Sequence, residues 1–144
     1  MFGHKNVLGE FTGDSHLFNA GYSIAKVGKL TAYAYLLDFN EQQVLSTATY
    51  GLRFAGKQAL DDAVSVVYEA EYAKQKDYKD NPLSLNLDYL HGEAGLSWKG
   101  VTALGGVESL EGNGVRGFST PLATLHKFQG YADVFLTTPA DGIV

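Results

Sequence analysis

Two glutamates, Glu69 and Glu71, form the first arrangement in the sequence that could carry chemistry. On a β-strand they would project from one face, because strand side chains alternate between the two sides of a sheet. Glycoside hydrolysis uses two carboxylates separated by about 5 to 10 Å. The same pair on a channel wall would tune ion preference, and on a soluble sheet it would be an ordinary solvated face. Nothing else in the sequence supports catalysis, so the pair does not predict an enzyme.

The remaining residues that could hold a metal or act as nucleophiles are scattered. No two of the four histidines have zinc-like spacing together with a third ligand, and the chain has no cysteine. Asp77, Asp80 and Asn81 lack the full calcium-loop pattern. There is no serine–histidine–aspartate elbow, phosphate loop or dinucleotide fingerprint. We therefore predict no catalytic residue, no metal site and no cofactor. The histidines are His4, His16, His91 and His126.

Length and composition predict a single domain over residues 1–144. The formal net charge of −5 argues against a nucleic-acid partner, because nucleic-acid binders are usually basic. No apolar run of about 18 residues is present, so no transmembrane helix is predicted. The opening stretch, MFGHKNVLGEF, lacks the continuous apolar core of a signal peptide. A secreted or outer-membrane protein would need one, so either the chain is cytoplasmic or its start is missing.

The dominant hydrophobic period is two, which predicts an all-β, antiparallel up-and-down meander. About six strands are expected, followed by a long C-terminal loop over residues 111–144. Within that loop, Thr120 and Pro121 suit the cap and first position of a short helix reaching about Phe128. The predicted strands span about 16–26, 29–39, 45–55, 63–73, 85–98 and 101–109.

The strands have one bulky face without charge and one polar face. This pattern fits a membrane barrel wall, with lipid on one side and a polar lumen on the other. It also fits a soluble sheet with one face in a core. The lumen-facing candidates are Arg53, Glu69, Glu71, Glu93 and Glu108. The lipid-facing candidates are Tyr22, Tyr33, Tyr35, Tyr50, Phe54, Tyr68, Tyr72 and Trp98.

The fifth predicted strand breaks the alternation. Leu85, Leu87 and Tyr89 are odd-numbered, whereas the apolar residues after them are even-numbered. A bulge near His91-Gly92 would switch the phase. Alternatively, the residues before Tyr89 belong to a loop.

The connections alternate in length. Short or intermediate turns at 27–29, 56–62 and 99–100 would lie at one end of the sheet. The charged stretch from Lys74 to Ser84 and the last segment would then lie at the other end. Outer-membrane barrels have this asymmetry, with short periplasmic turns and long external loops.

Four segments, in order, resemble the alginate-export family of outer-membrane β-barrel proteins. They are LGEFTGDSHLFNAGYSIAKVGKLTAYAYLLDF, STATYGLRFAG, GLSWKGVTALGGVESLEG and FSTPLATLHKFQGYADVFLTTPADGI. The resemblance implies a large porin-like barrel in the outer membrane of Gram-negative bacteria, of which this chain would be a part. It also implies passive transport of small solutes or of an anionic polysaccharide such as alginate. His126 and Lys127, in the last segment, are candidates for lining a pore constriction.

One departure concerns the solute. A channel for a polyanion should present Lys and Arg to its lumen, whereas the predicted lumen face sets Arg53 against four glutamates. The alternative function is a soluble antiparallel β domain that binds a small apolar ligand or a protein partner. An isolated wall of this kind has two open edges, which favour self-association.

Overall fold

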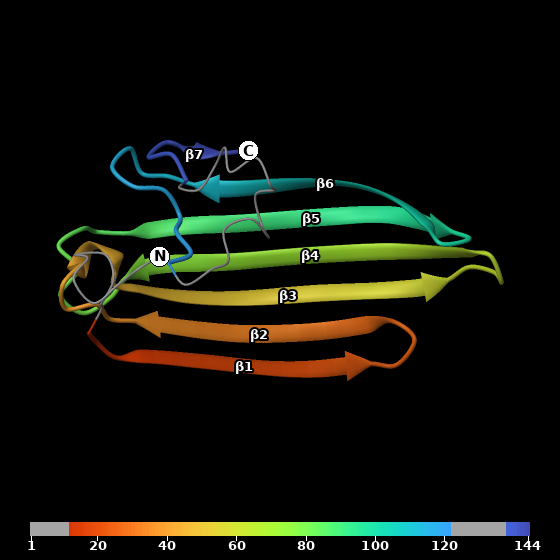
Figure 1. Ribbon diagram of the computed structural model, residues 1–144, viewed down its shortest axis with the longest axis horizontal. Helices are drawn as coiled ribbons and strands as arrows, with labels where there is room; N and C mark the ends of the chain where they lie inside the picture. The colour runs from red at the N-terminus through yellow and green to blue at the C-terminus, as the bar shows by residue number, and fades with distance from the viewer. Residues whose placement is uncertain (1–11, 122–137) are drawn as a thin grey trace, which may run out of the picture.

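Consecutive strands pair with one another in chain order and build one antiparallel meander (Figure 1). The computed structural model describes residues 12–121 and 138–144. All of the predicted strands are present, which confirms the all-β antiparallel fold class. A single 3₁₀ turn, η1 (Gln43–Leu45), is the helical element among the described residues. The strands are β1 (Ser15–Ile24), β2 (Gly28–Leu37), β3 (Thr47–Ala59), β4 (Val64–Asp77), β5 (Asn86–Trp98), β6 (Val101–Glu111) and β7 (Gly142–Ile143).

The segment predicted as one long loop contains a seventh strand. β7 pairs with Leu110 and Glu111 at the end of β6. The sheet does not close, and β1 and β7 form its two edges. Most of the predicted helix, together with His126 and Lys127, falls within residues 122–137, outside the described part of the chain.

The two ends of the sheet differ, as the connection lengths predicted. Tight turns join β1 to β2, β3 to β4 and β5 to β6 at the hairpin end, whereas the longer connections meet at the opposite end (Figure 1). At the turn before β4, Asp61 accepts hydrogen bonds from the N–H groups of Ala63 and Val64, each at 2.7 Å. At the turn after β5, Lys99 and Gly100 adopt positive φ angles of 45° and 87°, which the tight reversal requires.

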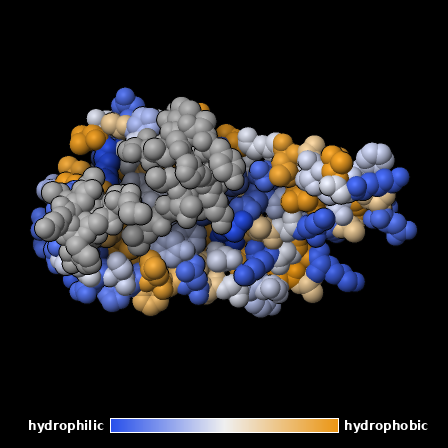
Figure 2. All heavy atoms as spheres, in the orientation of Figure 1, coloured by the Kyte–Doolittle hydropathy of each residue, from blue (hydrophilic) through white to orange (hydrophobic). Residues whose placement is uncertain are grey.

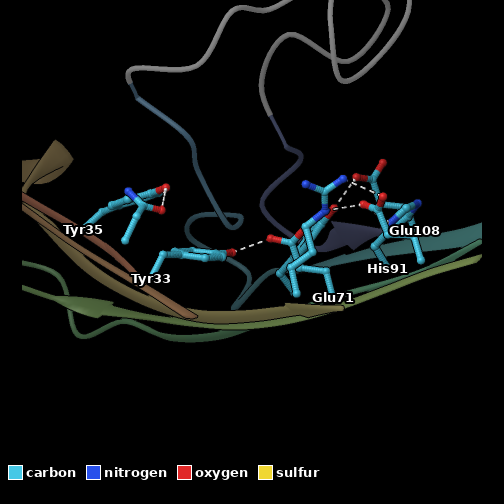
Figure 3. A network of polar contacts seen from close by, with 9 residues as sticks. Tyr33, Tyr35, Glu71, His91 and Glu108 are labelled. Carbon is cyan, nitrogen blue, oxygen red and sulfur yellow. Dashed lines mark hydrogen bonds and ion pairs between the residues drawn. The ribbon is translucent and has the colours of Figure 1, made fainter. Parts of the chain in front are cut away.

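The strand register divides the side chains into two faces, because directly opposed residues share a face. We call one the polar face; Arg53, Glu71, His91 and Glu108 lie opposite one another on it across β3 to β6. We call the other the apolar face; Phe54, Ala70 and Val107 lie on it in the same way. The sheet is curved, and the polar face is its concave side (Figure 3).

The predicted face of β2 is wrong. Tyr33 lies opposite Asn19 and Gly51, and Tyr35 lies opposite Leu17, so both tyrosines project from the polar face. Side-chain bulk alone predicts the opposite assignment. Pairing with the neighbouring strands, and the polar partners available to a tyrosine hydroxyl, outweigh bulk in setting the orientation.

The predicted bulge in β5 is also wrong. Pairing with β4 is continuous from Trp98 to Asn86, through His91 and Gly92. Leu87 and Tyr89 therefore share the polar face with His91. The residues on the polar face are therefore charged toward the hairpin end of the sheet and buried and apolar at the long-connection end.

The hydrophobic core lies at the long-connection end, on the polar face. Leu87 is 1% exposed and Phe118, from the connection after β6, is 3% exposed. The chain folds back over the sheet there and excludes water from a small cluster. Its buried members are Ala73, Leu85, Leu87, Leu110 and Phe118.

Candidate functional site

The charged residues on the polar face form a connected network with Arg53 at its centre. Figure 3 shows this network and labels Glu71, His91 and Glu108 in it. The Nε and Nη2 atoms of Arg53 donate to the two carboxylate oxygens of Glu69 at 2.6 and 2.5 Å. Glu71 lies 3.8 Å from Arg53 Nε, and His91 Nδ1 lies 3.7 Å from Glu69. The Arg53 side chain is 47% exposed, so the pairing contributes little to stability. The main effect of the pairing is to hold the charged groups of Arg53 and Glu69 in fixed positions on this face.

Tyrosine hydroxyls extend the network toward the buried end of the face. Tyr33 donates to Glu71 at 2.5 Å, and Tyr89 donates to Glu108 at 2.9 Å. Tyr35 donates to Asn19 at 3.0 Å, and its ring stacks on that of Tyr33 with centroids 4.9 Å apart. These bonds hold the carboxylates in set orientations on the concave side of the sheet.

Gly51 makes the Tyr33–Glu71 contact possible. It lies between the two residues on β3, and the tyrosine ring passes directly over it. A Cβ at Gly51 would lie 2.0 Å from Tyr33 Cζ. A glycine inside a strand often marks such a close approach.

Replacing Gly51 with alanine is therefore expected to displace the Tyr33 ring and break its bond to Glu71. We expect the free energy of unfolding to fall by about 1–3 kcal/mol, the usual cost of overpacking. Gly105→Ala is the matched control, because a Cβ there meets nothing within 4 Å. Urea unfolding of both variants measures the difference. Equal unfolding midpoints would contradict the role given to Gly51.

The apolar face carries an uncharged band. Among the strands β1 to β6, all of which are described, its acidic and basic residues are confined to the long-connection end. Many large side chains in the band are exposed, including Tyr22 at 70% and Leu96 at 54%. On β4 the band runs from Val64 to Tyr72, about 27 Å at roughly 3.4 Å per residue. The charged residues at its end are Lys74, Lys76, Asp88 and Glu111.

Aromatic residues mark both borders of this band. Tyr72 donates to Asp88 at 2.9 Å, and Lys74 pairs with the same carboxylate at 2.6 Å. At the hairpin end, the ammonium group of Lys99 lies 5.2 Å from the centre of the Trp98 ring. An apolar ring with a polar group at its edge suits a boundary between an apolar and an aqueous phase.

The segment from residue 112 to residue 121 leaves β6 and crosses the polar face. The Phe118 ring packs on Tyr89 with centroids 5.5 Å apart. Arg116 donates to the carbonyl of Val44, and burial lowers the pKa of its guanidinium. The segment occupies part of the space on the concave side of the sheet, at the long-connection end. Figure 2 shows this side of the molecule, with hydrophilic and hydrophobic residues interspersed over the hairpin half.

A second contact at the same end joins the start of the described chain to the η1 connection. Thr12 donates to Glu41 from its backbone N–H at 2.8 Å and also from its hydroxyl. These hydrogen bonds lower the pKa of the Glu41 carboxyl. The connection is thereby tied to the segment that precedes β1.

The structure gathers all five predicted lumen residues on the polar face. Of the eight residues predicted to face lipid, six lie on the apolar face, whereas Tyr33 and Tyr35 do not. Sequence reasoning missed Gln75, Tyr89 and Phe118, which hold the crossing segment. Their only signal was the odd-numbered phase of Leu87 and Tyr89, which matches that of Glu69, Glu71 and Gln75.

No protein-family model matches the chain, and neither a curated protein nor a solved structure matches it. The described residues contain no helix with the length and hydrophobicity needed to span a bilayer. In the same residues, no group of three or more His, Cys, Asp or Glu side chains is arranged to hold a metal ion.

Proposed function

We propose that the sheet is part of the wall of an outer-membrane β-barrel channel that passes small solutes by diffusion. The apolar face contacts lipid and the polar face lines the lumen. The observation that carries this proposal is the contrast between the faces. One presents a wide, exposed, uncharged band, and the other presents an ordered network of charges on the concave side.

The apolar band is too large to be left exposed to water and is expected to be buried against another apolar surface. Soluble monomers rarely expose a contiguous apolar patch larger than a few hundred Å². The band spans six strands, and half or more of the Tyr22, Leu90 and Trp98 surface is accessible. A tilted strand crosses a bilayer with about 9–11 residues, which the stretch from Val64 to Tyr72 supplies. Aromatic residues at both borders support lipid as that surface.

A complete wall needs partners for the sheet edges. Backbone groups in the hydrocarbon region must all be hydrogen-bonded, so a membrane sheet has no free edge. β1 is one edge, and β7 covers only Leu110 and Glu111 of β6. In our proposal, further strands complete the barrel, and in the purified protein other copies of the chain supply them.

The charges favour small neutral or cationic solutes. On the polar face, Glu69, Glu71, Glu93 and Glu108 outnumber the basic residues Lys29, Arg53 and Lys57. Arg53 is also engaged by Glu69 and is not directed at a solute. The resemblance to the alginate-export family supports a transport function. Passage of a polyanion would require basic residues supplied by other parts of the wall.

A soluble β domain that binds an apolar ligand or a protein partner is the second candidate. It is favoured by the water-excluded cluster around Leu87 and Phe118, which forms within the chain and needs no lipid. In that case the apolar band would be the binding surface.

A partition experiment distinguishes the two candidates. We expect the purified chain to be β-rich and dispersed only in detergent. We expect copies of it to associate through their open edges and to give discrete conductance steps in planar bilayers. A stable β-rich monomer in plain buffer, with no conductance after reconstitution, would reject the channel. Size-exclusion chromatography and circular dichroism with and without detergent provide the measurement.

A further inference from the structure

A fully buried glutamine, Gln75, holds the segment that crosses the polar face. Gln75 is 0% exposed and projects from β4 between Thr49 and Leu87 on the adjacent strands. Its Nε2 donates to the carbonyl of Ser119 at 2.7 Å and to Thr49 Oγ1 at 2.9 Å. Its Oε1 accepts the N–H of Ser119 at 2.9 Å. The amide therefore pairs with Ser119 through both main-chain groups, as a neighbouring strand would.

An apolar residue would be the ordinary choice at this position. The surroundings are the buried cluster of Leu87, Ala73 and Phe118, and burying a polar amide is unfavourable unless its hydrogen bonds are made. Ser119 lies outside every strand, so its N–H and carbonyl need partners from elsewhere. A glutamine at position 75 pairs both main-chain groups of Ser119 and, by the same hydrogen bonds, satisfies its own buried amide.

The other backbone contacts of the segment lie near β6. Phe118 N–H donates to the carbonyl of Glu111 at 2.8 Å, and Gly112 forms an isolated bridge with Gly117. These contacts fix where the segment starts. Two contacts reach farther from β6: Arg116 donates to the carbonyl of Val44, and the Gln75–Ser119 pair ties the segment to β4, two strands away from β6.

We propose that Gln75 is a positioning residue that keeps the segment 112–121 across the concave face and thereby limits the size of solute that passes. The second half of this inference rests on the proposed channel function. The first half is a statement about the fold and can be tested without any conductance.

The test uses Gln75→Leu in the purified full chain. Leucine keeps the volume and the packing against Leu87, but it cannot bond to Ser119. Thr49→Val is the matched control, because it removes one bond to Gln75 and leaves the Ser119 pairing intact. Ser119→Pro is a second variant that removes the N–H bonded to Gln75 and leaves the sheet residues unchanged.

Hydrogen exchange measured by mass spectrometry provides the first readout. We expect peptides covering residues 116–121 to exchange at least about tenfold faster in Gln75→Leu and Ser119→Pro, with β2 to β5 unchanged. Thr49→Val should resemble the wild type. Unchanged exchange in both test variants would overturn the positioning role.

Single-channel recording provides the second readout. We expect Gln75→Leu to raise conductance and to admit larger polyethylene glycols than the wild type. Faster exchange with the same polymer cut-off, in a wild type that conducts, would overturn the size-limiting role alone. A wild type without conductance would reject the channel and the size-limiting role, while exchange would still decide the positioning role.

Discussion

A lysine in place of Ala70 is expected to destabilise the membrane-inserted fold by about 2–4 kcal/mol, the cost of a basic residue on the lipid face near the bilayer midplane. Ala70 lies within the uncharged band, opposite Phe54 and Gly92, and its small side chain is exposed. The substitution therefore removes no packing and adds a flexible chain that ends in an ammonium group to the proposed lipid face. Urea titration of folding into lipid vesicles measures the effect.

Ala55→Lys is the matched control for this prediction. It makes the same chemical change on the polar face, where Ala55 lies opposite Glu69. We expect a change within about 0.5 kcal/mol, as for ordinary surface substitutions. If both lysines cost the same small amount, neither face contacts lipid. The apolar band would then be an exposed surface awaiting a protein partner or ligand.

The sequence period was sufficient to predict the fold class and most strand positions. Alternation over β1, β3, β4 and β6 is clear, because each has mostly apolar residues on one face and mostly polar residues or Gly on the other. β2 is different, because both of its faces are apolar by composition. Tyr33 and Tyr35 are amphipathic, and only the register shows that their hydroxyls meet Glu71 and Asn19.

The crossing segment lay beyond sequence reasoning for a different reason. Gln75 follows Glu69 and Glu71 in phase, so it looks like one more solvated residue on a polar face. Its burial depends on Phe118 and Ser119, 43 and 44 positions later in the chain, folding back over β4. Such long-range contacts leave no local signal. The one available clue, the odd phase of Leu87 and Tyr89, is equally consistent with a bulge.

In the proposed channel, the charge network should determine which ions pass. Replacing Arg53 with glutamine removes the cation that engages Glu69 and approaches Glu71. The two carboxylates would then act on the lumen without a basic partner. We expect the preference for K⁺ over Cl⁻ to increase several-fold at low salt, because a face with uncompensated negative charge concentrates cations. Reversal potentials across a salt gradient measure the change.

Ionic strength and a compensating variant test the cause of this change. The effect of Arg53→Gln should largely disappear near 1 M salt, where the screening length falls to about 3 Å. The double variant Arg53→Gln/Glu69→Gln restores the net charge of the face and should return the preference close to that of the wild type. Stability should change little in the single variant, because an arginine that is 47% exposed contributes at most about 1 kcal/mol through its ion pairs. Unchanged reversal potentials in both variants, with conductance preserved, would mean that ions do not travel along the polar face. The network would then serve only to fix the curvature and register of β3, β4 and β5.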